Sequence, residues 1–172
     1  MALYNEKMAK NITQITEQET LDFYFEAILE KIEAILGYKL ELGERKEFVK
    51  GINSEDVYLT SRPIVSIVEC LYSGVDITRF INVKSNRKIN IGTELCSCDE
   101  IEIEYIAGYS ELPKNIQMFI FEQIVLAGTK IDEAGLKSYS IKDISYTYIN
   151  DLDKNKNFID SIINMFGATA CL

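Results

Sequence analysis

The chain has 172 residues, of which 47% are hydrophobic and 26% are charged, a composition typical of globular proteins and not of disordered ones. Acidic residues outnumber basic ones by 27 to 18, and the resulting formal charge of −9 disfavours wrapping of nucleic acid and adhesion to anionic membranes. Histidine is absent, which removes the commonest general base and the Ser-His and Cys-His nucleophile pairs, so the sequence favours a protein that is not an enzyme and needs no cofactor.

The chain is expected to begin with an irregular arm, residues 1–15, which shows neither periodicity nor the apolar core of a signal peptide. We therefore expect synthesis in a cytosol. A long helix is predicted next, because a capping box at Thr16–Glu19 precedes apolar residues at helical spacing from Leu21 to Leu36. Gly37 suits the position that follows a helix end.

A β insertion is predicted from residue 46 to residue 107, where the apolar period changes from that of a helix to two. The pairs Ser73-Gly74 and Ser85-Asn86 supply turns between short strands. We expect a small, mostly antiparallel sheet in this part of the chain.

The last predicted strand, "DEIEIEY", separates an apolar face from an acidic one. Ile101 and Tyr105 mark the apolar face, and Glu100, Glu102 and Glu104 form the acidic face. Like charges at this spacing repel, so basic side chains are expected beside them on neighbouring strands: Arg79, Lys84, Arg87 and Lys88. A solvated face is the preferred interpretation, and a divalent-cation site is the alternative.

Four cysteines are present, Cys70, Cys96, Cys98 and Cys171. Cys96 and Cys98 are spaced CxC and not CxxC, and the other two have no cysteine nearby in the sequence. Unligated thiols are therefore the preferred interpretation, with a zinc site built from all four as the alternative.

Pro113 opens a second predicted helix, which is apolar nearly all round and must be covered by its own fold or by a neighbouring subunit. The stretch "GLKSYSIKDISYTY", residues 135–148, follows as a short β-ribbon with two apolar sets of opposite parity. A last helix carries an apolar stripe from Phe158 to Phe166, and residues 168–172 are expected to form a mobile tail.

Together these elements predict an α+β fold in a single domain, residues 1–172. A helical bundle, made of the long N-terminal helix, the central helix and the C-terminal helix, carries a small mostly antiparallel β-sheet inserted between its first two long helices. A short β-ribbon precedes the last helix. The helices must meet in space for their apolar stripes to be covered.

Three stretches carry a resemblance: "FVKGINSEDVYLTSRPIVSIVECLYSG" at 48–74, "IEIEYIAGYSELPKNI" at 101–116, and the ribbon sequence at 135–148. In this order they resemble the head–tail connector proteins of tailed bacteriophages, also called head completion or adaptor proteins. The second stretch is similar to the alternating strand, the Tyr-x-Ala-Gly-Tyr turn and the Leu-Pro helix start of that family. Tryptophan, frequent in the second helix of the family, is absent here.

The resemblance implies a non-catalytic structural protein of the virion, located at the head–tail junction. It implies a homo-oligomeric ring of about a dozen copies below the portal. Such a ring binds the portal protein, extends the DNA channel and offers a platform to the next neck or tail completion protein. DNA would pass through the channel without specific binding, and no membrane is involved.

The sequence contains two sets of candidate site residues. The ribbon residues are expected to join neighbouring subunits or the portal, with packing on their own sheet as the alternative: Tyr139, Ile141, Ile144, Tyr146 and Tyr148. Acidic residues are expected to face the channel or solvent: Glu100, Glu102, Glu104, Asp151 and Asp153.

Other functions remain open at this point. The first is a different phage neck or tail-completion protein, which keeps the ring and changes the neighbours. The second is an acidic regulatory protein that imitates DNA. A hydrolase that uses only carboxylates ranks last, because the sequence shows no clustered acidic motif.

Overall fold

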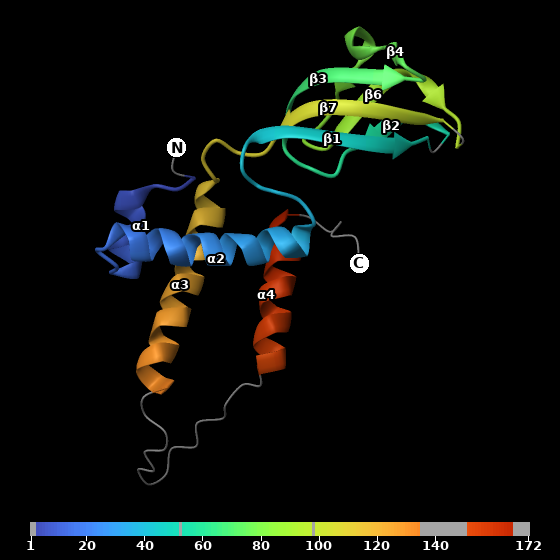
Figure 1. The fold of residues 1–172 in the computed structure, drawn as a ribbon. Helices are drawn as coiled ribbons and strands as arrows, with labels where there is room; N and C mark the ends of the chain where they lie inside the picture. The colour runs from blue at the N-terminus through green and yellow to red at the C-terminus, as the bar shows by residue number, and fades with distance from the viewer. Residues whose placement is uncertain (1–2, 52, 98, 135–150, 167–172) are drawn as a thin grey trace. The chain divides into compact units, whose positions relative to one another are not determined.

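The computed structural model describes residues 3–51, 53–97, 99–134 and 151–166 (Figure 1). The chain divides into two compact units. The β unit comprises Tyr38–Leu112, and the helical unit comprises the described residues before and after it, within 3–37 and 113–166. The predicted insertion of β structure between two long helices is therefore confirmed.

The helical unit contains four helices in the described part of the chain: α1 (Glu6–Thr13), α2 (Gln18–Leu36), α3 (Lys114–Ala134) and α4 (Asp151–Phe166). Helix α1 corrects the prediction of an irregular arm over residues 1–15. The side chain of Asn5 caps it by accepting a hydrogen bond from the backbone N–H of Met8 at 3.0 Å.

The ends of α2 match the sequence pattern only in part. The predicted capping box at Thr16 does not form, because Glu17 is the N-cap and makes no side-chain capping bond. Gly37 ends the helix in the left-handed conformation at φ 76°, as predicted, and its N–H bonds to the carbonyl of Glu33.

An aromatic cluster forms the core of the helical unit. Tyr4 lies 4.3 Å from Phe25 and 5.9 Å from Phe121, measured between ring centroids. The Tyr4 hydroxyl contacts the carboxylate of Asp22 and accepts a hydrogen bond from Gln18 at 2.9 Å. Tyr4 holds the chain just before α1 in this cluster, which accounts for an ordered helix where an irregular arm was predicted. A stacked pair, Phe119 and Phe158 at 5.6 Å, joins α3 to α4.

The β unit contains seven strands in its described part, and Figure 1 shows β1, β7 and β3 side by side. The strands are β1 (Gly43–Lys50), β2 (Ser54–Tyr58), β3 (Ile64–Tyr72), β4 (Val75–Asp76), β5 (Asn82–Val83), β6 (Lys88–Leu95) and β7 (Glu100–Ala107). A single turn of 3-10 helix, η1 (Thr78–Phe80), lies between β4 and β5.

These strands form two antiparallel sheets, where the sequence predicted one. The four-stranded sheet has the order β1-β7-β3-β4, and the three-stranded sheet has the order β2-β6-β5. Strand alternation alone does not reveal which strands pair, so the division into two sheets was missed.

Buried side chains of both sheets make one hydrophobic cluster. The four-stranded sheet contributes Ile103 and Tyr105, and the three-stranded sheet contributes Ile89 and Leu95, all of them fully buried. Burial of one such side chain stabilises the fold by about 1.5–3 kcal/mol. The predicted apolar face of "DEIEIEY" is confirmed, and its acidic residues lie on the opposite face of the four-stranded sheet.

Candidate functional site

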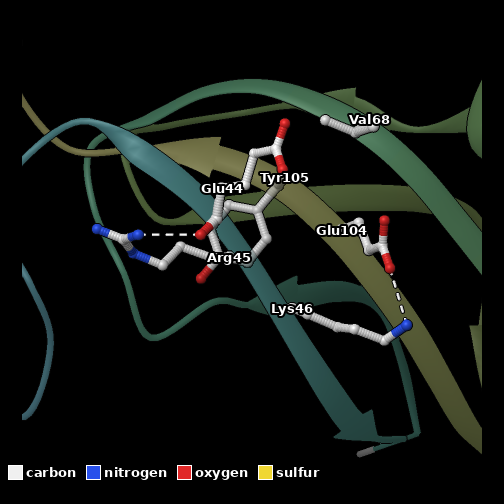
Figure 2. Close-up of a pocket in the computed structure, with 6 residues that line it drawn as sticks. All are labelled: Glu44, Arg45, Lys46, Val68, Glu104 and Tyr105. Carbon is white, nitrogen blue, oxygen red and sulfur yellow. Dashed lines mark hydrogen bonds and ion pairs between the residues drawn. The ribbon is translucent and has the colours of Figure 1, made fainter.

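The acidic face of the four-stranded sheet is organised by one lysine of the edge strand. Lys46 of β1 is opposite Glu104 of β7 in the strand register. Its Nζ lies 2.8 Å from Oε1 of Glu104, as Figure 2 shows, and also forms an ion pair with Glu102. Hydrogen bonds to Glu102 and then to Glu104 raise the pKa of Lys46 above its usual value. The ammonium group therefore stays charged and offsets the repulsion between the two carboxylates.

The predicted basic neighbours of this face, Arg79, Lys84, Arg87 and Lys88, were the wrong ones. Lys88 forms an ion pair with Asp56 at 2.8 Å. Arg79 and Arg87 lie over the aromatic rings of Phe80 and Tyr58. The reason is topological: β7 pairs with β1 and β3, whereas β5 and β6 belong to the other sheet.

The Lys88–Asp56 pair lies on the three-stranded sheet and is partly exposed. The hydrogen bond from Lys88, followed by one from Asn90, lowers the pKa of Asp56. The same contact raises the pKa of Lys88. Both groups are therefore charged at neutral pH, and the pair connects β2 to β6.

The alternative interpretation of the acidic face was a divalent-cation site. Lys46 occupies the position between Glu102 and Glu104 that such a cation would take. In the described ranges, no three acidic or cysteine side chains come close enough together to hold a metal ion. Of the cysteines described, Cys70 is buried and Cys96 is exposed.

A hollow lies beside the lysine on this face (Figure 2). Its lining residues are Glu44, Arg45, Lys46, Val68, Glu104 and Tyr105. Arg45 donates to the backbone carbonyls of Glu44 at 2.9 Å and Glu41 at 2.8 Å, which holds its guanidinium at the rim. Lys46 and Glu104 thus pair with each other, and Arg45 pairs with the backbone.

The four-stranded sheet also carries exposed apolar side chains, of which Val68 lines the hollow. Phe48 on β1 is 62% exposed, and Val65 and Val68 on β3 are 57% and 50% exposed. Exposed apolar surface marks a protein contact where it is contiguous. These exposed side chains were not predicted from the sequence, although Phe48 lies at the same parity as Lys46 and Lys50 in "KEFVK" and so belongs on the polar face.

The structure describes only some of the remaining predicted site residues. Glu100 is exposed at the start of β7, opposite Lys50. Asp151 and Asp153 lie in the first turn of α4. The five ribbon residues, Tyr139, Ile141, Ile144, Tyr146 and Tyr148, lie outside the described residues, as does the tail 168–172.

No protein-family profile and no curated protein matches this sequence. Solved structures do match it. A chain in the neck of an empty gene transfer agent (GTA) particle, computed with C6 symmetry, matches with a TM-score of 0.56 at 11% identity, over 96% of this chain and 90% of that chain. A chain in the virion of a native GTA particle matches with a TM-score of 0.55, also at 11% identity and over the same shares.

The matches cover nearly the whole of both chains and show a shared fold. In addition, no helix in the described part of the chain is both long and apolar enough to cross a membrane.

Proposed function

We propose that this chain is a virion structural protein of a tailed phage or a phage-like particle. In this proposal it forms a ring below the portal, joins the head to the neck or tail and extends the DNA channel. The likeness to chains of GTA particles, one of them in the neck, over 96% of this chain and 90% of the matched chain, is the observation that carries the proposal. The resemblance of three sequence stretches to head–tail connectors supports it independently.

The character of the candidate site also supports a structural role. Lys46 forms ion pairs with both Glu102 and Glu104, and apolar side chains of the same sheet are exposed to solvent. Both features favour contact with another protein surface over chemistry on a small substrate. The protein would act without catalysis.

A ring needs a heterologous contact, in which one patch meets a different patch on the next copy. The neck of the GTA particle was computed with C6 symmetry. A ring of about a dozen copies, as the connector resemblance implies, is compatible with sixfold symmetry. The portal protein and the next neck or tail protein would bind the two ends of the ring.

The ribbon residues are the proposed contact with a neighbouring subunit or with the portal. Replacing Tyr146 and Tyr148 by Ser should abolish ring formation while the monomer stays folded, as judged by circular dichroism and light scattering. Tyr58→Ser, at a tyrosine that is 49% exposed, is the matched control. Unfolding of the double variant would instead show that the tyrosines pack within their own subunit.

The excess negative charge is proposed to let packaged DNA slide without sticking. Lys46 neutralises part of the charge of Glu102 and Glu104, so Glu100, Asp151 and Asp153 carry more of this proposal. Affinity for duplex DNA at low salt should be negligible. A tight, salt-sensitive complex would contradict it.

The decisive experiment measures the mass of the purified protein alone and with the portal protein of the same particle. A closed oligomer, or one that forms on the portal, supports the proposal. A stable monomer that binds neither the portal protein nor the tail proteins contradicts it. Binding to tail proteins without portal would favour the alternative, a tail-completion protein. Inhibition of a DNA-binding enzyme by the monomer would favour a DNA mimic.

A further inference from the structure

Helix α2 presents an acidic stripe with an exposed aromatic ring near its middle. Glu19, Phe23, Glu26 and Glu30 recur at spacings of four, three and four residues and therefore share one helix face. Phe23 is 68% exposed, and the three carboxylates are exposed as well. Within the described ranges, none of these carboxylates forms an ion pair. We call these four residues the acidic stripe.

A basic and apolar surface lies on the β unit. Residues 77–88 contain four basic residues and no acidic one, although the whole chain has a formal charge of −9. The guanidinium carbon of Arg79 lies 4.6 Å from the ring centroid of Phe80, and that ring is 51% exposed. Val83 is 46% exposed on the edge strand β5, and Lys84 follows it at the surface. We call Arg79, Phe80, Val83 and Lys84 the basic edge.

The two surfaces are similar in length, and each carries a phenylalanine between charged residues. The three turns from Glu19 to Glu30 cover roughly 16 Å. The run from Phe80, at the end of η1, through β5 to Lys84 covers roughly 13 Å. Each surface combines an exposed phenylalanine with charged side chains, three carboxylates on the stripe and Arg79 and Lys84 on the edge. Asp76 lies near Arg79 and Asp56 near Lys84, and they offset part of the positive charge of the edge. The acidic stripe is repelled by a second acidic stripe, so it needs a different surface as its partner.

We infer that the acidic stripe of one copy docks on the basic edge of a second copy. This inference rests on the proposed ring and assigns it a contact between subunits. It supplies the two different patches that a heterologous, closing contact requires. Phe23 and Phe80 would become buried together at its centre, while the carboxylates pair with Arg79 and Lys84 at the rim.

Charge reversal tests the contact. The variant Glu26→Lys/Glu30→Lys and the variant Arg79→Glu/Lys84→Glu should each raise the dissociation constant of the oligomer at least about tenfold. An equimolar mixture of the two should assemble again, because copies can then alternate around a ring with opposite charges at every contact. The matched control, Glu94→Lys/Glu122→Lys, changes the net charge equally at exposed sites outside both surfaces and should assemble like the wild type. Assembly is followed by light scattering.

Cross-linking tests the same contact without relying on the charges. In a background with Cys96, Cys98 and Cys171 replaced by Ser, copies carrying Phe23→Cys are mixed with copies carrying Phe80→Cys. A bifunctional maleimide should join the two kinds of copy into a dimer, and neither kind alone should give one. A cross-link formed only within a chain that carries both cysteines would overturn the inference.

The outcomes separate the inference from the function on which it rests. Recovery of assembly on mixing, together with the intermolecular cross-link, supports the contact. If both charge-reversal variants assemble into rings as the wild type does, the proposed contact is wrong and the proposed ring stands. A wild-type protein that stays monomeric at high concentration and in the presence of portal overturns both.

Discussion

The hydroxyl of Tyr105 on β7 donates a hydrogen bond to the carboxylate of Glu47 on β1, across a sequence separation of 58 residues. The same hydroxyl accepts a hydrogen bond from the backbone N–H of Ser61 at 3.1 Å. The Glu47 carboxylate also accepts one from the N–H of Thr60 at 3.1 Å. One buried tyrosine and one carboxylate thus tie the connection between β2 and β3 to the edge of the four-stranded sheet.

Tyr105→Phe removes the donor to Glu47 and the acceptor for Ser61 while keeping the ring. We expect the free energy of unfolding to fall by about 1–3 kcal/mol, because polar partners in a buried site are left unsatisfied. Urea denaturation measures this change. Tyr58→Phe, at an exposed tyrosine, is the matched control and should have little effect. Equal stability of both variants would show that the network contributes nothing.

The network also makes stability depend on pH at the alkaline end. Burial, followed by the hydrogen bond to Glu47, raises the pKa of Tyr105 above its ordinary value of 10.0. Above that pH the unfolded chain binds fewer protons at this residue than the folded one, so the free energy of unfolding falls as the pH rises. Below it, the contribution is fully present. Urea denaturation from pH 8 to pH 11 should therefore show a shallower decline for Tyr105→Phe than for the wild type, and parallel curves would contradict this assignment.

Gly108→Ala is expected to destabilise the β unit severely. Gly108 has φ 106°, and a Cβ there would lie 2.4 Å from the backbone oxygen of Glu41. Gly74 is the matched control, because it also has a positive φ of 78° but open space around it. Gly74→Ala should cost about 1 kcal/mol of unfolding free energy from backbone strain, and Gly108→Ala should cost clearly more. Equal losses in thermal denaturation would show that the close approach is unimportant.

Phe121→Ala tests the aromatic core of the helical unit. Phe121 is fully buried, 5.9 Å from Tyr4 and 6.2 Å from Phe25 between ring centroids. Truncation should reduce the free energy of unfolding by about 3–5 kcal/mol. Phe23→Ala, at the exposed ring of α2, is the control and should leave the stability of the monomer nearly unchanged. A large loss in the control would mean that Phe23 packs within its own subunit.

Thiol labelling distinguishes the two described cysteines. Burial, followed by the nearby charge of Asp76, raises the pKa of Cys70 to about 11, whereas Cys96 is exposed. A maleimide at neutral pH should modify Cys96 in the folded protein and Cys70 only after unfolding. Mass spectrometry of the digested protein measures modification at the two sites separately. Equal rates of modification of Cys70 and Cys96 in the folded protein would contradict the burial of Cys70.

The sequence predicted the buried face of β7 because one strand carries the whole alternation from Ile101 to Tyr105. It did not predict the partner of Glu104, since Lys46 reaches it only through a pairing between distant strands. Local pattern carries no information on such a pairing. This is why basic residues close in sequence were assigned to the acidic face and Lys46 was not.

Helix α1 was missed for a related reason. It has only eight residues, too few for a stable isolated helix, and it depends on packing that involves Tyr4 and Ala9. Gly37 was assigned correctly because its role at the end of α2 is local.

The interface assigned to Tyr139–Tyr148 stays a prediction. The exposed Phe23 was not noticed, because the pattern of α2 identifies the buried face of the helix and leaves exposed apolar residues unexplained.

The insertion of the β unit between α2 and α3 has a consequence for synthesis on the ribosome. Tyr4 and Phe25 emerge early, but their partner Phe121 follows only after the whole of Tyr38–Leu112. The β unit is continuous in the chain and can fold as soon as it has emerged, whereas Tyr4 and Phe25 lack the contact with Phe121 until α3 follows. During that interval the nascent chain exposes apolar side chains of α2, and transiently exposed surface of this kind is prone to aggregation.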